Sequence, residues 1–353
     1  MKKKLLTAAI AAAMIAPLAV QADGSGPTVY GKLHVSTDHV DYDETARGDY
    51  WQVESRASRL GVKGSEDLGG GLKAIYKMEF EVDIADESGA DNFTSRNQYV
   101  GLAGNWGTFL LGRHDTPYKV MTGKDMFSDT IADWNKLGFT GGAKGIVEDK
   151  RADNAIMYIS PSFNGLTMSA LVSPGEDNTD DGIDDFYTSL GAKYANGPLY
   201  LAAAWEETEF DGDDGANPAN DDETRWRVYG SYKIGDFKLG AMYQDTESEN
   251  NLKDVDAQAW QVQGTYSMGS NVLKVAYQDG EIEDDRAAAV AGGYDAPEYD
   301  AWVAALEHHF SKRTYAYALY TQSDTNDDAQ NAASRASGSE DWDAFSLGLV
   351  HKF

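Results

Sequence analysis

The residue types that could bind a metal ion or catalyse a reaction form no complete site in this sequence. Cysteine is absent, so the chain has no thiolate ligand and no cysteine nucleophile. The six histidines lack the spacing of a helical zinc site, and the adjacent His308 and His309 would point to opposite faces of a strand. No Gly-x-Ser-x-Gly motif marks a nucleophilic serine. We therefore predict no cofactor, no metal site, no catalytic residue and no enzymatic activity.

Two acidic segments, EDNTDDGIDD at 176–185 and DGDDGANPANDDE at 211–223, resemble calcium loops in composition. A calcium loop that began at Asp177 would place Thr179 at its third position and Thr188 at its twelfth, where oxygen-rich acidic ligands are required. We interpret both segments as solvated loops. Loose bridging of divalent cations to lipopolysaccharide or to another loop stays open as the alternative.

The bulk charge and the first residues indicate an exported protein that does not bind nucleic acid. The net charge of −28 over 353 residues offers no basic face for phosphate contacts. Three lysines at positions 2–4 precede an apolar stretch over 5–20, and Val20 and Ala22 are small residues at the −3 and −1 positions of a cleavage site. This pattern predicts a signal peptide over residues 1–22 and a mature protein over 23–353.

Most of the chain alternates apolar and polar residues with a period of two, which is typical of β-strands that expose one face to an apolar environment. Clear cases are GLKAIYKMEFEV at 71–82, RWRVYGSYKIG at 225–235 and FSLGLVHKF at 345–353. In the last segment Phe345, Leu347, Leu349 and Phe353 share a face, and the pattern runs to the final residue. A soluble sandwich would also give such alternation.

The connections between these segments favour a membrane barrel over a sandwich. Short turns such as DLGGG, NGP and MGSN alternate with longer polar stretches along the whole mature chain. The longer stretches lie near 38–50, 83–94, 114–150, 174–185, 207–223, 245–256, 279–298 and 322–341. Seven short and eight long connections join sixteen strands, with all long loops at one end. The sequence therefore predicts an all-β fold, a 16-stranded antiparallel transmembrane β-barrel with short periplasmic turns and long extracellular loops.

Several segments resemble the general, non-specific trimeric porins of the Gram-negative outer membrane. These are VYGKLHV at 29–35, SRLGVKGSEDLGGGLKAIYKMEFEVD at 58–83 and QYVGLAGNWGTFLLGRHDTPY at 98–118. The resemblance implies a homotrimer of barrels in which the third long loop, at 116–150, folds into the lumen as a constriction. It also implies that Phe353, Leu349, Leu347 and Phe345 form the C-terminal signal read by the barrel-assembly machinery.

The same resemblance assigns the constriction residues. Porins of this family place carboxylates of the third loop opposite basic residues of the barrel wall. The matching acidic positions are Asp125 and Asp129, with Asp115 and Asp133 as further candidates. The matching basic positions are Arg59, Arg96 and Arg151, and Lys32 and Lys63 join them because they have inward parity. A purely structural role, in which the arginines hold the loop by pairing with carboxylates, remains an alternative.

Together these features predict an outer-membrane porin, a water-filled channel for passive diffusion of small hydrophilic solutes and ions. Acidic loops at the mouth predict a mild preference for cations. The expected partners are outer-membrane lipid and lipopolysaccharide. A channel specific for a sugar, phosphate or organic acid is the first alternative, and a plugged structural or adhesive barrel is the second.

Overall fold

A computed structural model describes residues 26–42, 48–85, 92–137, 147, 149–174, 185–210, 222–250, 253–284, 298–325 and 341–353. Within these ranges the chain forms one short helix and a 17-stranded antiparallel sheet. The predicted signal peptide, most of the segment 176–185 and residues 211–221 lie outside the described residues. No helix in the described ranges is long and apolar enough to cross a membrane.

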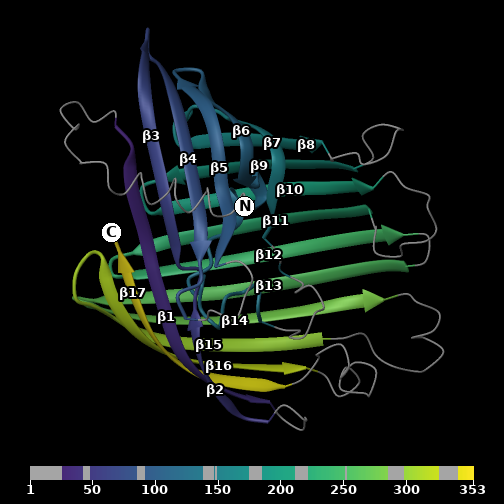
Figure 1. The fold of residues 1–353 in the computed structure, drawn as a ribbon. Coiled ribbons are helices and arrows are strands. Elements are labelled where there is room, and N and C mark those ends of the chain that lie inside the picture. Colours follow the sequence, from purple (N-terminus) through teal and green to yellow (C-terminus); the bar gives the residue numbers. More distant parts are fainter. Residues whose placement is uncertain are drawn as a thin grey trace.

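The elements follow one another as an up-and-down meander (Figure 1). The first half contains β1 (Thr28–Tyr42), β2 (Tyr50–Ser55), β3 (Arg59–Gly69), β4 (Leu72–Val82), β5 (Phe93–Gly104), β6 (Gly107–Asp115), α2 (Pro117–Thr122), β7 (Arg151–Ile159) and β8 (Leu166–Pro174). The second half contains β9 (Asp185–Asn196), β10 (Leu199–Phe210), β11 (Asp222–Ile234), β12 (Phe237–Asn250), β13 (Lys253–Met268), β14 (Asn271–Asp284), β15 (Glu298–His309), β16 (Thr314–Thr325) and β17 (Trp342–Lys352).

The strands β2 and β3 are two parts of one barrel strand. Both pair with β1, where Val35 lies opposite Ser55 and Lys32 lies opposite Arg59. Between them the backbone bends at Ala57, whose φ angle is 48°. The side chain of Arg56 turns inward there, pairs with Asp38 and donates from Nε to the Ser36 hydroxyl at 3.0 Å. With β2 and β3 counted once, the barrel has the predicted sixteen strands.

The first and last strands close the sheet. β1 pairs with β17 from Lys32 opposite Lys352 to Tyr42 opposite Trp342, and the two strands lie side by side in Figure 1. Two further backbone bonds of 3.1 Å join Gly31 and the terminal Phe353. The chain can therefore end inside a strand, because the last residue is tied to the first strand.

Side chains alternate across the barrel wall as the period of two predicts. On β17, Phe345, Leu347 and Leu349 are exposed on the outer face, whereas Ala344, Ser346 and Val350 are buried on the inner one. Such an outer surface suits hydrocarbon, which solvates apolar side chains but not polar ones.

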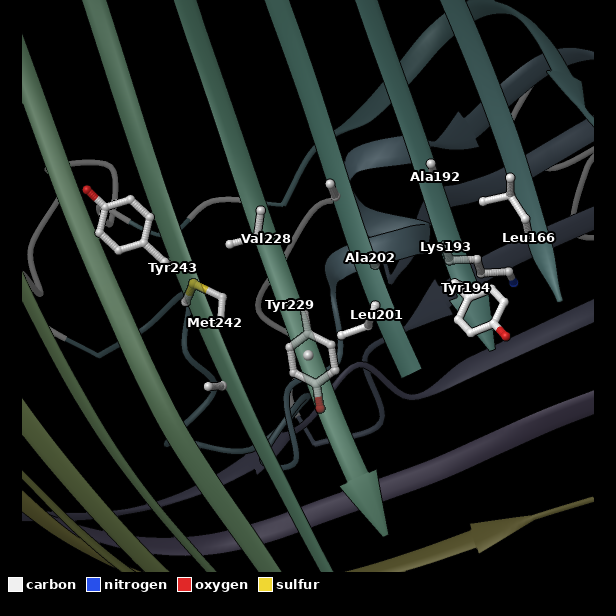
Figure 2. A pocket seen from close by; sticks show the side chains of 13 residues that line it. Leu166, Ala192, Lys193, Tyr194, Leu201, Ala202, Val228, Tyr229, Met242 and Tyr243 are labelled. Atoms are coloured by element: carbon white, nitrogen blue, oxygen red, sulfur yellow. The ribbon is translucent and has the colours of Figure 1, made fainter. Parts of the chain in front are cut away.

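Small outward residues leave an apolar groove of about 560 Å³ on the outer wall across β8–β12 (Figure 2). Leu201, Val228 and Tyr243 lie along it, with Ala192 and Gly230 between larger neighbours. Its lining is apolar, like the rest of the outer face.

One predicted connection is much shorter than expected. The sequence predicted a long polar loop near 245–256, but β12 continues to Asn250 and β13 begins at Lys253. The prediction was wrong because it ended both strands where the apolar alternation ends. Backbone pairing between antiparallel strands does not depend on side-chain polarity, so the ladder continues beyond the apolar band.

The terminal Phe353 ring lies where a side chain on Gly31 would be. A Cβ atom at Gly31 would stand 2.4 Å from Cζ of Phe353 and 2.8 Å from the carbonyl oxygen of Arg59. Gly31→Ala is therefore expected to lower the free energy of unfolding by about 1–3 kcal/mol, as overpacking does elsewhere. Denaturant unfolding followed by heat-modifiable electrophoretic mobility measures this effect. The control is Gly264→Ala, where the nearest atom is a flexible leucine methyl group at 3.3 Å; equal losses in both variants would contradict the prediction.

Candidate functional site

The long connection between β6 and β7, residues 116–150, enters the barrel and starts with a capped helix. The Thr116 hydroxyl accepts a bond from the Lys119 amide at 3.3 Å, and Pro117 occupies the first turn of α2. This helix lies on the inner face of β9. The Tyr118 amide donates to the Ser189 hydroxyl at 3.2 Å. Residue 191 is a glycine, and a Cβ atom at that position would collide with Met121 and Pro117 of the helix. We call residues 116–150 loop 3.

Side chains of the inner wall bind the backbone of loop 3. The side-chain amide of Gln263 accepts a bond from the backbone N–H of Met126 and donates one to the backbone carbonyl of Lys124, both at 2.9 Å. Lys274 donates to the Met126 carbonyl at 2.9 Å. The Gln278 amide donates to the Trp134 carbonyl at 3.3 Å. Loop 3 is thereby held along β13 and β14.

Apolar contacts add to these bonds. Phe127, Ile131, Trp134 and Leu137 of loop 3 are buried in one cluster with inward residues of the wall. Many of the wall residues in that cluster are alanines, namely Ala257, Ala259, Ala276, Ala301, Ala305 and Ala344. Small inward side chains leave the space that a packed loop requires. The predicted in-folded third loop is confirmed by these contacts.

Asp129 connects loop 3 to the opposite part of the wall. One of its carboxylate oxygens lies 2.5 Å from Nζ of Lys32 on β1 and 2.5 Å from Nη2 of Arg59 on β3. Burial alone would raise the pKa of the Asp129 carboxyl, but the Lys32 and Arg59 cations outweigh burial and hold that pKa below its ordinary value. The backbone of Asp129 is left-handed, with φ of 63°, a conformation that aspartate tolerates better than most residues.

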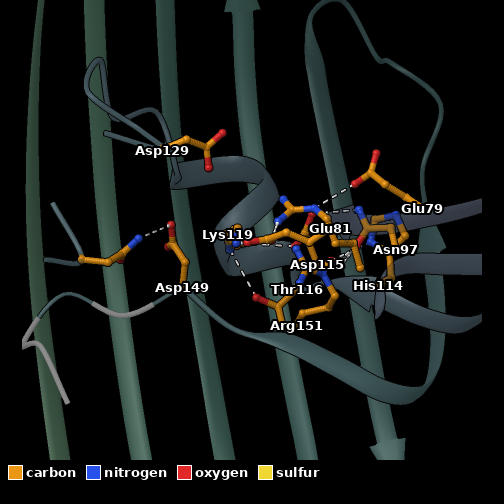
Figure 3. Close-up of polar contacts among 12 residues, drawn as sticks. Glu79, Glu81, Asn97, His114, Asp115, Thr116, Lys119, Asp129, Asp149 and Arg151 are labelled. Carbon is orange, nitrogen blue, oxygen red and sulfur yellow. Dashed lines mark hydrogen bonds and ion pairs between the residues drawn. The ribbon is translucent and has the colours of Figure 1, made fainter. Parts of the chain in front are cut away.

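Two further charge clusters line the wall beside loop 3. Arg96 on β5 lies 3.1 Å from Glu79 and 2.5 Å from Glu81, and Lys77 lies 3.1 Å from Glu79. At the start of loop 3, Asp115 pairs with Arg151 at 2.9 Å and with Lys119 at 3.6 Å. Figure 3 shows Asp115, Lys119 and Arg151 together, with Asp129 farther along the loop.

The end of loop 3 is anchored by a buried ion pair. Nη1 of Arg227 on β11 donates to Asp149 at 2.7 Å, and the guanidinium lies 4.3 Å from the Tyr118 ring centroid and 5.0 Å from that of Trp134. Burial would raise the pKa of the Asp149 carboxyl, but the Arg227 cation lowers it below its ordinary value. Arg227 therefore joins both ends of loop 3 to the wall.

Asp125 and Asp133, two of the predicted constriction carboxylates, bind backbone amides within loop 3. The Asp125 carboxylate accepts from the amides of Phe127 at 2.9 Å and Trp134 at 3.0 Å. The Asp133 carboxylate accepts from the amides of Asp129 at 2.8 Å and Asn135 at 3.0 Å. Both side chains are turned into loop 3, because its tight turns leave backbone N–H groups that need acceptors. Burial raises the pKa of both carboxyl groups.

The other predicted residues lie on the inner wall. Lys63 extends over the ring of Tyr30, with Nζ at 4.9 Å from the centroid. Of the four predicted carboxylates, Asp129 and Asp115 contact basic wall residues. Sequence reasoning did not select Glu79, Arg227 or Asp149. The inward parity of Glu79 and Arg227 was a usable signal, whereas nothing in the sequence places Asp149 opposite Arg227.

Among the described residues, no three His, Asp or Glu side chains are grouped as the ligands of a metal ion would be. His308 contacts Asn271 and His309 contacts Glu307, so these neighbours have separate partners.

Comparison with known proteins identifies the family of this barrel. The family model described as Gram-negative porin matches residues 7–328. The outer membrane porin protein 32 of Delftia acidovorans is 33% identical over 264 residues, which cover 71% of this chain and 72% of that protein. The chain belongs to the Gram-negative porin family.

Two further comparisons extend this result. The monosaccharide porin of a Halomonas species is 27% identical over 277 residues, covering 73% of each chain. The solved structure of an anion-selective porin from Comamonas acidovorans has a TM-score of 0.73 at 25% identity and covers 93% of this chain and 100% of that one. The chain is accordingly an outer-membrane channel with a closed 16-stranded barrel. The predicted barrel fold, the porin function and the outer-membrane location are confirmed.

Arg227→Met would leave the Asp149 carboxylate buried without its cation. We expect this variant to lose about 3–5 kcal/mol of unfolding free energy, the usual cost when one partner of a buried pair is removed. Loop 3 should then become accessible to proteases in the folded barrel. The matched control is the double variant Arg227→Met/Asp149→Asn, which removes both charges and should recover part of the loss. Equal destabilisation of the single and double variants would contradict this account.

The Asp129 contacts predict a dependence of stability on pH. Because the folded pKa of Asp129 lies below the unfolded one, its pairs with Lys32 and Arg59 stabilise the folded state above about pH 4 and are lost as pH falls through the folded value. The difference in unfolding free energy between wild type and Asp129→Asn should therefore be constant near neutral pH and shrink in acid. Denaturant titrations at several pH values measure it, and a difference that grew in acid would disagree with the structure.

Proposed function

We propose that this porin is a general diffusion channel whose selectivity is set between Asp129 of loop 3 and the basic residues of the inner wall, and that it catalyses no reaction. The observation that carries the proposal is the position of loop 3, which crosses the lumen of a closed barrel and reaches Lys32 and Arg59 through Asp129. Arg96, Arg151 and Lys63 extend the basic wall around this point.

Opposite charges on the two sides of a narrow aqueous passage create a field across it. Such a field orients water, so apolar solutes must disturb ordered water to pass, while small hydrophilic solutes need not. Guanidinium groups suit the wall because they stay charged in any environment. The pairing of Asp129, Asp115 and Glu79 with wall cations also supports the structural role that the sequence left open, and both roles are compatible.

We further propose a mild preference for cations. The cations Lys32, Arg59, Arg96 and Arg151 each have a carboxylate partner, so the wall carries less free positive charge than its arginines suggest. The chain as a whole carries 58 acidic and 30 basic residues, which concentrates cations at its openings. The structural neighbour from Comamonas acidovorans is an anion-selective porin, so the sign of the reversal potential decides this part of the proposal.

For the assembled channel we propose a homotrimer embedded in outer-membrane lipid and lipopolysaccharide. Membership of the porin family supports the trimer, and the outward apolar residues support lipid contact. The terminal Phe353, with Phe345, Leu347 and Leu349, is the segment that we propose the barrel-assembly machinery reads. Cleavage after Ala22 remains the proposed start of the mature chain.

A channel specific for a sugar is the second candidate, because one relative is named a monosaccharide porin. Liposome-swelling rates separate the two candidates. A general channel admits hydrophilic solutes in order of size, whereas a specific one admits its sugar faster than smaller solutes.

The selectivity test compares wild type with Asp129→Asn in planar bilayers under a KCl gradient. Wild type is expected to give a reversal potential with the sign of a channel that prefers K⁺ over Cl⁻. The variant frees the Lys32 and Arg59 cations and should shift the potential toward the anion sign by several millivolts or more. The control is Asp67→Asn, at an exposed position near the turn between β3 and β4. An unchanged potential in Asp129→Asn would contradict the assigned role, and no conductance in wild type would contradict the channel itself.

A further inference from the structure

Four lysines gather on one part of the lumen wall without carboxylate partners. Lys193 lies on β9, Lys233 on β11, Lys238 on β12 and Lys124 on loop 3 beside them. We call these four residues the lysine patch. Within the described part of the chain none of them forms an ion pair.

All four side chains belong to the inner side of the barrel. Tyr232 and Leu239 are 48% and 57% exposed on the outer face, so their neighbours Lys233 and Lys238 have inward parity. Lys193 is two residues beyond Gly191, whose inner side contacts α2 of loop 3. The patch therefore faces the water-filled lumen.

The positions of the four lysines are close enough for their charges to interact. Lys233 and Lys238 lie directly opposite each other in the ladder between β11 and β12. Nζ of Lys124 donates to the Val120 carbonyl at 2.9 Å and lies 5.7 Å from the Tyr200 ring centroid. Burial, and then the ammonium groups of Lys193 and Lys238, lower the pKa of Lys124 and outweigh the Asp149 carboxylate, which raises it. Like charges in direct opposition destabilise a sheet, so an anion bound between these lysines would stabilise the arrangement.

The patch differs in this respect from the constriction. There, Lys32, Arg59, Arg96 and Arg151 each contact a carboxylate. Lys274 lies in the same row as Lys238, with Thr265 between them, and it pairs with Glu307. Asp236 lies in the turn between Lys233 and Lys238 and pairs with neither. Other described lysines, such as Lys63 and Lys352, also lack a carboxylate at ion-pair distance, but their register partners Lys77 and Lys32 each contact one. Among the described residues, neither Lys233 nor Lys238 of the opposed pair does.

The patch also has a defined position relative to loop 3. Gln263, which binds the loop backbone at Lys124 and Met126, is two residues along β13 from Thr265, the register partner of Lys238. The ladder row of Lys233, Lys238 and Thr265 therefore lies two residues nearer the short turns than Gln263, which binds the loop. Lys124 belongs to loop 3, and Lys193 lies in the row of Ala202, Tyr229 and Met242. The patch therefore extends from loop 3 toward the short turns.

We propose that the lysine patch binds multivalent oxyanions, solutes that carry two or more phosphate or carboxylate groups, beside loop 3. Ammonium groups offer compact charge and three donors each, which suits oxygen atoms of such anions in several orientations. Four cations spread over three strands and a loop favour a ligand with more than one charged group over a single halide. The inference rests on the proposed channel, since the ligand must reach the patch through the lumen.

The experiment uses the full-length porin in planar bilayers, with pyrophosphate as the probe. Pyrophosphate is added to each side in turn during KCl conduction, and the half-blocking concentration is measured. We expect block of wild type at a lower concentration from one side than from the other. In Lys233→Gln/Lys238→Gln the half-blocking concentration should rise about tenfold, and adding Lys124→Gln and Lys193→Gln should raise it further.

The control removes the same number of charges elsewhere in the lumen. Lys73→Gln/Lys352→Gln changes inward lysines of β4 and β17 and should leave the half-blocking concentration within about twofold of wild type. The proposal would be overturned if pyrophosphate blocked wild type and Lys233→Gln/Lys238→Gln at the same concentration. It would also be overturned if the control variant raised the half-blocking concentration as much as Lys233→Gln/Lys238→Gln does. Normal heat-modifiable mobility and KCl conductance show that each variant folds. KCl conduction without pyrophosphate block contradicts the lysine patch alone, whereas absence of conduction contradicts the channel.

Discussion

The closed backbone ladder is the constraint on which the rest of this porin depends. Hydrocarbon offers no partner to N–H and C=O groups, so every strand that crosses it needs a neighbour on both edges. The pairing of β1 with β17 supplies the last of these edges, and Gly31 and Phe353 extend it to the final residue. Because the wall is complete, its inner face encloses water and its outer face can be apolar throughout.

Closure also makes loop 3 possible. A loop of this length has many backbone groups, and within a lumen it finds partners that solvent would otherwise provide. The amides of Gln263 and Gln278 bind its carbonyl groups, and Asp125 and Asp133 bind its N–H groups from within the loop. Inward alanines give it space, and the buried pair of Arg227 and Asp149 fixes its return. The same set of contacts narrows the pore and holds the loop in place.

Charge is distributed unevenly along the lumen. Around loop 3 the lysines and arginines are largely neutralised by carboxylates at ion-pair distance, so the field there runs between closely spaced opposite charges. The lysine patch, which extends from Lys124 of loop 3 toward the short turns, has no such partners in the described residues. With a screening length of about 8 Å at physiological salt, these two regions act on a passing solute one after the other rather than as one average field.

The barrel could be predicted from the sequence, because a period of two with apolar residues on one face, and the alternation of short and long connections, indicate each strand locally. The sequence also identified the inward lysines and arginines, since parity decides which side of the wall each occupies. It could not decide that Asp129 reaches Lys32 and Arg59 while Asp125 and Asp133 turn into the loop, nor that Asp149 meets Arg227. Those outcomes depend on the path of an irregular loop across a closed lumen. Only the tertiary structure fixes that path, because each carboxylate binds whichever cations or amides the fold brings within reach.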